Sequence, residues 1–274
     1  MSKRILLPPA RAWSRALAAC LLLGSAARAQ VVQVLPAKDN TLFQPDTLGE
    51  RSSALGPQVY AGRVGGVGGA VGLRRAVLAF DVASSVPPGS TVLAATLTIT
   101  CSHVPVFDRN TTRTHRLRRA TSDWGEGTSD AGVNNGTGAA PTPGDATWSH
   151  TAFPSSFWSS PGGDFVGTVS SSVGVTNTGT YVFPSTPQLV ADVQAMLDNP
   201  SGNFGWVLSG EEAVSGAARA FDSREAPAYP LYGGVAPVLA VTYVQGVPTL
   251  GPASLVLLAL LALGGGAWLL GRRT

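Results

Sequence analysis

Cysteine is scarce in this sequence, with two residues in a chain of 274. Cys20 lies within a hydrophobic amino-terminal segment that we expect to be removed, which leaves Cys101 alone in the remaining chain. A single cysteine forms no internal disulfide, so the disulfide-stabilised scaffolds of small secreted proteins are excluded. Cys101 lies in an apolar, strand-like run and is predicted to be a buried small hydrophobe. The fold must therefore be stabilised by its hydrophobic core.

Charged residues are also few, at 13% of the chain, and the basic excess belongs to the two ends. Five of the 19 lysines and arginines lie in residues 1–29 and two lie in the last three residues. The 12 that remain face 16 acidic residues, which gives the middle of the chain a net charge of −4. Because an acidic balance lacks the attraction that nucleic-acid binding needs, we expect no nucleic-acid partner.

Motifs that carry catalysis are missing as well. The sequence has no Gly-x-Ser-x-Gly, His-Glu-x-x-His or Cys-x-x-Cys pattern, and its three histidines share no ligand spacing. His115 and His150 lie in strand-like runs and are expected to be packed or hydrogen-bonded. The glycine-rich stretch 62–72 lacks the Gly-Lys-Ser/Thr ending of a phosphate loop and is interpreted as a hairpin tip. We expect a protein that is not an enzyme, although two carboxylates meeting in space would suit a glycosidase.

The amino terminus has the layout of a secretory signal peptide. Basic residues begin it, an apolar run over residues 16–23 follows, and Ala27-Arg28-Ala29 forms a small-x-small cleavage site. The apolar run is far shorter than the ~20 residues that a membrane-spanning helix needs. We predict a signal peptide over residues 1–29 and an exported ectodomain over residues 30–246.

The carboxy terminus, residues 247–274, is predicted to be a membrane anchor. A nearly uninterrupted apolar run over residues 255–270 would span ~24 Å as a helix, somewhat less than the ~30 Å of a bilayer core. Membrane contact is expected over residues 253–270. The terminal pair Arg272 and Arg273 would lie on the cytoplasmic side, which leaves the ectodomain outside.

This tail also resembles a known class of signal. Val247-Pro248-Thr249-Leu250, the marginal helix and the arginine pair are similar to the IPTL-type relatives of the PEP-type bacterial sorting signals. The resemblance implies a sortase-like processing enzyme as a partner. It also implies a place at the cell envelope or outer surface, either anchored in the membrane or released after processing. A plain single-span anchor is the alternative.

Between the two ends, the hydrophobic periodicity is that of β-strands. Residues 91–100 alternate between two faces, and turns rich in glycine, proline and serine separate the runs. Further β-rich runs lie at residues 76–82, 166–175, 180–183, 206–208 and 238–244. One helix is predicted from Thr186-Pro187 to the stop at Asn199-Pro200. The pattern predicts an all-β, antiparallel sandwich with one short helix capping an open end.

The ordered landmarks of the middle segment resemble a family. They are Asp39-Asn40-Thr41-Leu42, Arg75-Ala76-Val77-Leu78-Ala79-Phe80-Asp81, Val86-Pro87-Pro88-Gly89-Ser90, Ala94-Ala95-Thr96-Leu97, Trp124-Gly125-Glu126, Ala146-Thr147-Trp148, Asn203-Phe204-Gly205-Trp206, Phe221-Asp222-Ser223-Arg224-Glu225 and Pro237-Val238-Leu239. Over residues 31–245 the set is similar to DNRLRE-type domains, which are related to disaggregatase-like repeats and to a carbohydrate-binding module family. The resemblance implies a jelly-roll β-sandwich on a secreted bacterial protein. Some members bind acidic polysaccharides.

Two clusters are candidates for binding. Asp123, Glu126 and Asp130 lie in one acidic loop, whose carboxylates and carbonyls suit a structural calcium ion. The alternative is a solvated turn whose acids accept hydrogen bonds from backbone amides. In an extended strand, Arg116 and Arg118 fall on one face, where two guanidinium groups suit the oxyanions of an acidic glycan. The alternative is that they pair with local acids.

Trp158 lies in a loop and is interpreted as an exposed ring for stacking on sugars, whereas Trp148 and Trp206 are expected in the core. The alternative for Trp158 is a lid over the edge of the sandwich.

We expect a non-catalytic surface protein that binds an acidic polysaccharide or another envelope component. A structural or adhesive envelope protein without a glycan ligand is the first alternative, and a polysaccharide-degrading enzyme is the second.

Overall fold

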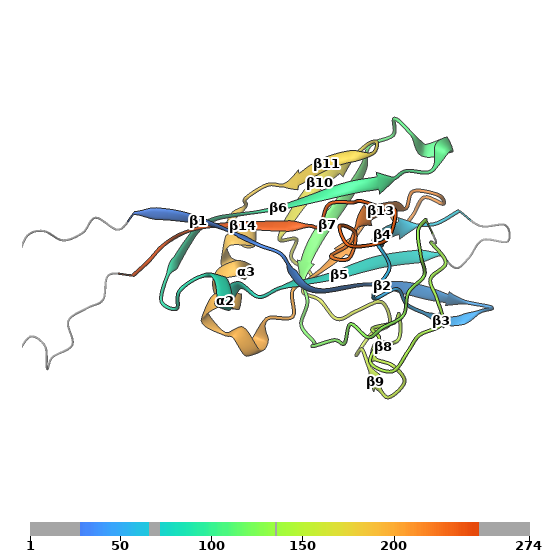
Figure 1. Cartoon of the computed structure of the whole chain (residues 1–274), viewed down its shortest axis with the longest axis horizontal. Coiled ribbons are helices and arrows are strands. Elements are labelled where there is room, and N and C mark those ends of the chain that lie inside the picture. Colours follow the sequence, from blue (N-terminus) through green and yellow to red (C-terminus); the bar gives the residue numbers. More distant parts are fainter. Residues whose placement is uncertain (1–27, 66–71, 135, 247–274) are drawn as a thin grey trace, which may run out of the picture. The chain divides into compact units, whose positions relative to one another are not determined.

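Short antiparallel strands account for most of the regular structure (Figure 1). The computed structural model describes residues 28–65, 72–134 and 136–246. The strands are β1 (Ala29–Val34), β2 (Pro36–Asp46), β3 (Gly49–Arg51), β4 (Gln58–Arg63), β5 (Leu73–Phe80), β6 (Thr91–His103), β7 (Arg113–Arg119), β8 (His150–Ala152), β9 (Ser156–Phe157), β10 (Ser171–Val175), β11 (Gly179–Phe183), β12 (Trp206–Ser209), β13 (Arg219–Asp222) and β14 (Val238–Val244). The helical elements are α2 (Val82–Ser85), η1 (Val106–Asp108), α3 (Pro187–Asp198) and η2 (Pro200–Gly202).

The predicted carboxy-terminal anchor lies outside the described residues, and so does the predicted signal peptide apart from residues 28 and 29. Most of the glycine-rich stretch 62–72 also lies outside them. In the part of the chain that the structure describes, no helix is long and apolar enough to cross a membrane. The domain described below is the unit Ala29–Val244.

Twelve strands form one curled sheet whose two halves face each other as layers. The first layer holds β1, β14, β6, β11 and β13, and the second holds β2, β3, β5, β12, β7 and β10. Strand β4 pairs with β13 in one layer and with β5 in the other, so it joins them. Every described pair of strands is antiparallel. The predicted all-β, sandwich-like class is confirmed.

The core between the layers comes from the inward half of each alternating strand. Trp206 in β12, Phe80 in β5 and Leu97 in β6 are all fully buried in one apolar cluster. Cys101 belongs to the same cluster, as predicted, and burial raises the pKa of its thiol to about 12. No disulfide contributes, so this apolar burial must stabilise the domain.

Three strand predictions need correction. The alternation predicted for residues 91–100 is interrupted, because the register shifts opposite Thr242 and Tyr243. As a result Val92 is buried and Leu93 is half exposed. The run 166–175 is a strand only from Ser171, since residues 166–170 follow β7 with irregular hydrogen bonds. The run 76–82 ends at Phe80, where α2 begins.

The predicted helix is α3, and its boundaries follow from its end residues. Thr186 accepts a hydrogen bond from Leu189 N at 3.0 Å, and Pro187 occupies the first turn. The helix stops before Asn199-Pro200, as expected. It buries an apolar stripe that includes Val193 and Leu197 against the core.

His115 and His150 are both packed, as expected. His150 hydrogen-bonds Thr147 Oγ1 through Nδ1 at 2.9 Å. His115 is fully buried beside the ring of Phe221, with a centroid distance of 5.1 Å. Burial, and then the charges of Arg219 and Arg116, lower the pKa of His115 to about 4.

We expect His115 to make the protein less stable in acid. The unfolded histidine binds a proton near pH 6.5, and the folded one only near pH 4. Protonation therefore favours the unfolded state as the pH falls through this window, by about 3 kcal/mol at pH 4. Urea unfolding at several pH values should show this loss, and the His115→Gln variant should lose less between pH 6.5 and 4. Equal pH dependence in the two proteins would contradict the assignment.

A long connection, residues 120–170, covers part of the outer face of the second layer. Trp124, Trp148 and Trp158 pack there against Leu42, Val77 and other residues of the sheet in a second apolar cluster. The outward side chains of β5, β12 and β7 beyond this cluster form its margin beside Phe165, where the arginines are partly buried.

Candidate functional site

The margin of the second layer carries three arginines, Arg75, Arg116 and Arg118, which we call the arginine face. Arg116 in β7, Ser209 in β12 and Arg75 in β5 are direct cross-strand neighbours. Arg118 emerges on the same side of β7 as Arg116, and its Nη1 donates to Ser209 Oγ at 3.0 Å. Leu117 between them is fully buried. The predicted placement of Arg116 and Arg118 on one face is confirmed.

Positive charge exceeds negative charge on the arginine face. Arg75 forms a two-fold ion pair with Glu212, with nitrogen–oxygen distances of 2.7 and 3.0 Å. Among the described residues, Arg116 has no acidic partner. Partial desolvation, and then the charges of Arg116 and Arg75, lower the pKa of Arg118. The expected alternative, in which Arg116 and Arg118 pair with local acids, is therefore not what the structure has.

Aromatic rings support two of these guanidinium groups. The ring of Phe165 lies 5.3 Å from the guanidinium of Arg75 and 5.9 Å from that of Arg118. The ring of Trp148 also contacts Arg75, with its centroid 5.1 Å from the guanidinium carbon. Stacking of this kind restrains the planar groups. All three guanidinium nitrogens of Arg75 donate within the protein, to Glu212 and to the carbonyl of Gly162, whereas Arg118 donates through Nη1 to Ser209.

The expected exposure of Trp158 is wrong. Its side chain is 5% exposed, and its Nε1 donates to the carbonyl of Thr147 at 2.8 Å. The ring packs inside the cluster under the long connection, so it has no free face for a sugar. Trp158 therefore covers the sheet, which was the alternative interpretation.

The three acids of the predicted calcium loop do not converge. Asp123 pairs with Lys38 at 2.8 Å, Glu126 pairs with Arg224 at 2.8 Å, and Asp130 accepts from Tyr229. Across the described ranges, no three Asp, Glu, His or Cys side chains are arranged as a metal site. Calcium binding stays a prediction, which the melting temperature with and without a chelator would test.

Glu126 instead joins a buried carboxylate network that sequence reasoning missed. Its Oε1 accepts from Asp39 N at 2.9 Å, and Asp39 Oδ2 accepts from Arg224 N at 2.7 Å. Arg224 also pairs with Glu225 at 2.7 Å. Burial, and then the charge of Glu225, raise the pKa of Asp39 well above its usual range. The segments that contain Asp39, Glu126 and Arg224 are far apart in the sequence, and these three residues bring them together through side-chain carboxylates that bind backbone amides and a guanidinium group.

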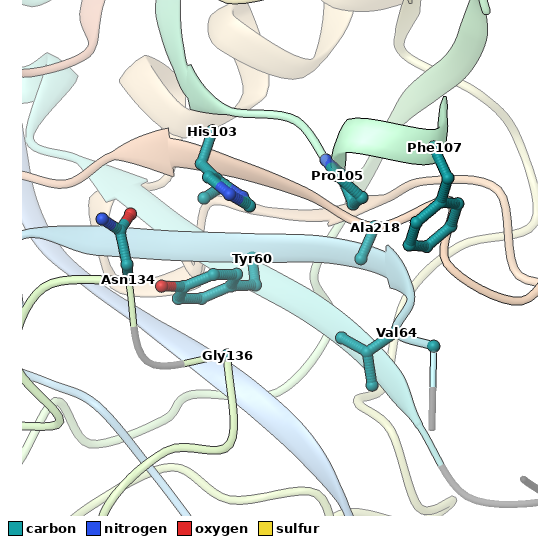
Figure 2. Close-up of a pocket in the computed structure, with 10 residues that line it drawn as sticks. Tyr60, Val64, His103, Pro105, Phe107, Asn134, Gly136 and Ala218 are labelled. Atoms are coloured by element: carbon teal, nitrogen blue, oxygen red, sulfur yellow. The ribbon is translucent and has the colours of Figure 1, made fainter. Parts of the chain in front are cut away.

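The first layer carries a groove on its outer face (Figure 2). Tyr60 in β4, Ala220 in β13 and His103 in β6 are consecutive cross-strand partners that form its floor. The cavity has a volume of about 420 Å³ and a mostly apolar lining. This size is within the range of ordinary small-molecule sites.

One wall of the groove is the short turn η1, which presents Pro105 and Phe107 (Figure 2). The turn is held by Asp108, which pairs with Arg113 at 2.6 Å and with Arg219 at 2.7 Å. Arg219 is fully buried and also donates to the carbonyls of Ala217 and Thr111. The wall is therefore fixed from below by a buried ion pair.

Asn134 and Gly136 lie on the opposite side of the groove (Figure 2). The backbone N–H of Asn134 donates to Gln58 Oε1 at 2.7 Å, and Arg74 Nε donates to the carbonyl of Gly136 at 2.8 Å. This side is thus tied to β4 and β5, whereas the η1 wall is tied to β7 and β13. No local motif predicts this groove, because it depends on the register of three strands and on two distant loops.

A scan against models of protein families finds no match to this chain, and a search of curated proteins finds none either.

Proposed function

We propose that this protein is an exported, surface-associated, non-catalytic module that binds an acidic polysaccharide through the arginine face. The observation that carries the proposal is the row Arg116–Ser209–Arg75 beside Arg118, in which three guanidinium groups are opposed by one carboxylate. Guanidinium groups bind carboxylate and sulfate groups through paired N–H···O bonds, so a polyanionic chain suits this surface.

Spacing supports a polymer as the ligand. Arg116 and Arg75 lie on strands separated by β12, so their backbones are about 10 Å apart, which is two inter-strand distances. A chain that crosses β7, β12 and β5 would present its acidic groups to Arg116 and Arg118, while Arg75, which Glu212 and Gly162 already engage, lies at the far side of the row. Binding of this kind needs no reacting group, and we propose no catalytic residues.

The proposed location, on a bacterial surface, is inferred from the sequence. The signal peptide, the sorting-type tail and the DNRLRE-type resemblance together favour delivery of a jelly-roll domain to a bacterial surface. The meeting of Asp39, Glu126 and Arg224 supports the resemblance, because these residues come from three of its separate landmarks.

Binding to polygalacturonate and dextran sulfate tests the proposal, with uncharged dextran as the reference. We expect both anionic polymers to bind and the affinity to fall as salt rises, since exposed charges are screened. The double variant Arg116→Ala/Arg118→Ala should lose at least about tenfold in affinity, because each lost charged hydrogen bond is worth about 1.5–3 kcal/mol.

Arg109→Ala is the matched control, because Arg109 is an exposed arginine outside the arginine face. It should bind like the unchanged protein. If the control and the double variant lost the same affinity, the binding would be nonspecific electrostatic attraction. If the unchanged protein bound none of the polyanions, a structural envelope protein would be favoured.

A further inference from the structure

We propose that the groove on the first layer is a second binding site, for an uncharged sugar residue stacked on Phe107. This inference concerns a different surface from the arginine face and does not depend on acidic-glycan binding. The two surfaces share no residue and lie on the outer sides of different layers.

The groove displays an aromatic ring in a fixed position. Phe107 is 76% exposed, although a large apolar side chain is normally withdrawn from water. The ring is seated on Gly216, where a Cβ atom would lie 2.2 Å from Phe107 Cε2. Gly216 also has a φ of +78°, which disfavours any other residue. Gly216 therefore leaves room for the ring of Phe107, which a side chain at position 216 would displace.

The floor beside the ring is shallow because its residues are small. Ala218 lies beside Phe107, and Tyr60 lies toward Asn134 (Figure 2). Ala220 lines the floor between its cross-strand partners Tyr60 and His103. A flat ring can thus lie against Phe107 without meeting bulky side chains. The C–H bonds on one side of a pyranose are attracted to the negative face of an aromatic ring.

Charge decides against an acidic or basic occupant. Among the described residues that line the groove, none is a lysine, arginine, aspartate or glutamate. Arg74 and Arg219, which belong to strands beside it, donate to protein carbonyls and to Asp108. The polar lining groups are the imidazole of His103 and the amide of Asn134, which both suit hydroxyl groups. Asn134 Oδ1 accepts from Gln58 Nε2 at 3.3 Å, so the groove offers the amide N–H groups of Asn134 and the exposed imidazole of His103 to the hydroxyl groups of a ring. An aliphatic peptide side chain would use neither of these groups.

Calorimetric titration of the full chain tests the site with uncharged β-1,4-linked hexasaccharides of glucose, mannose and N-acetylglucosamine. We expect at least one of them to bind. Phe107→Ala should weaken that binding about tenfold, and Phe107→Tyr should retain it. His103→Ala, a change at an exposed position, should weaken it as well.

The Arg116→Ala/Arg118→Ala variant is the control that separates the two sites, and it should bind the uncharged sugar unchanged. The inference is overturned if none of the three sugars binds, if binding survives both Phe107→Ala and His103→Ala, or if the arginine variant abolishes it. Binding of a leucine-rich peptide in place of the sugars would also overturn it. Unfolding midpoints of each variant establish that lost binding is not lost folding.

Discussion

Asp108→Ala is expected to lower the free energy of unfolding by about 3–5 kcal/mol, because it leaves a buried charge without its partner. Arg219 is fully buried, and Asp108 is its acidic partner, at 2.7 Å. The carbonyls that Arg219 also contacts supply no net charge. Arg113, the second partner of Asp108, loses its ion pair in the same variant.

Urea unfolding followed by circular dichroism measures this effect, and Asp123→Ala is the matched control. Asp123 also forms an ion pair, with Lys38, but its side chain is 73% exposed. Removing it should cost about 1 kcal/mol or less. A similar small loss for Asp108→Ala would mean that Arg219 reaches water or another acceptor.

A double replacement separates the effect of losing the Asp108–Arg219 ion pair from the effect of leaving one buried charge without a partner. Apolar residues of similar volume often replace a buried ion pair with little cost. We therefore expect Asp108→Leu with Arg219→Met to recover much of the stability that Asp108→Ala loses. Because Asp108 ends the turn that carries Phe107, the double variant should still bind uncharged sugar more weakly.

Trp206→Ala is expected to cost about 3–5 kcal/mol, through the cavity that it leaves. The ring is fully buried between β5 and β7, with the ring of Phe80 at 6.0 Å in an edge-to-face arrangement. Its Nε1 also contacts Asp192 Oδ2 at 3.4 Å, so truncation removes a donor from a buried carboxylate. Urea unfolding midpoints measure the change.

Two variants calibrate this result. Trp206→Phe keeps most of the apolar volume and should cost clearly less than alanine. Phe107→Ala removes an aromatic ring that is 76% exposed and should change stability by about 0.5 kcal/mol or less. If Trp206→Ala were as mild as Phe107→Ala, the core described between the two layers would be wrong.

Patterns of period two and of helix ends were the reliable signals in this sequence. The alternation in residues 113–119 predicted which arginines share a face, and the strand confirms it. Thr186-Pro187 and Asn199-Pro200 predicted both ends of the helix. These signals are local, since each depends on residues within a few positions of one another.

The errors arose where distant segments meet. The loop position of Trp158 suggested exposure, but the long connection folds back on the sheet and buries its ring. The sequence also did not show that Asp123, Glu126 and Asp130, which are close together in it, each contact a partner from another part of the chain, although calcium binding itself stays a prediction. The bulge in β6 reversed an alternation for a similar reason, because the partner strand β14 sets the register.

By itself, the sequence determined the strand-rich class, the helix α3, the burial of Cys101 and the shared face of Arg116 and Arg118, but not the short helix α2. Each of these follows from backbone periodicity and from the absence of a second cysteine in the domain. Only the tertiary structure decided that Arg75 joins those arginines and that Phe107 faces Asn134 across a groove. Such neighbours are set by strand register and loop packing, which depend on contacts between residues tens to more than a hundred positions apart.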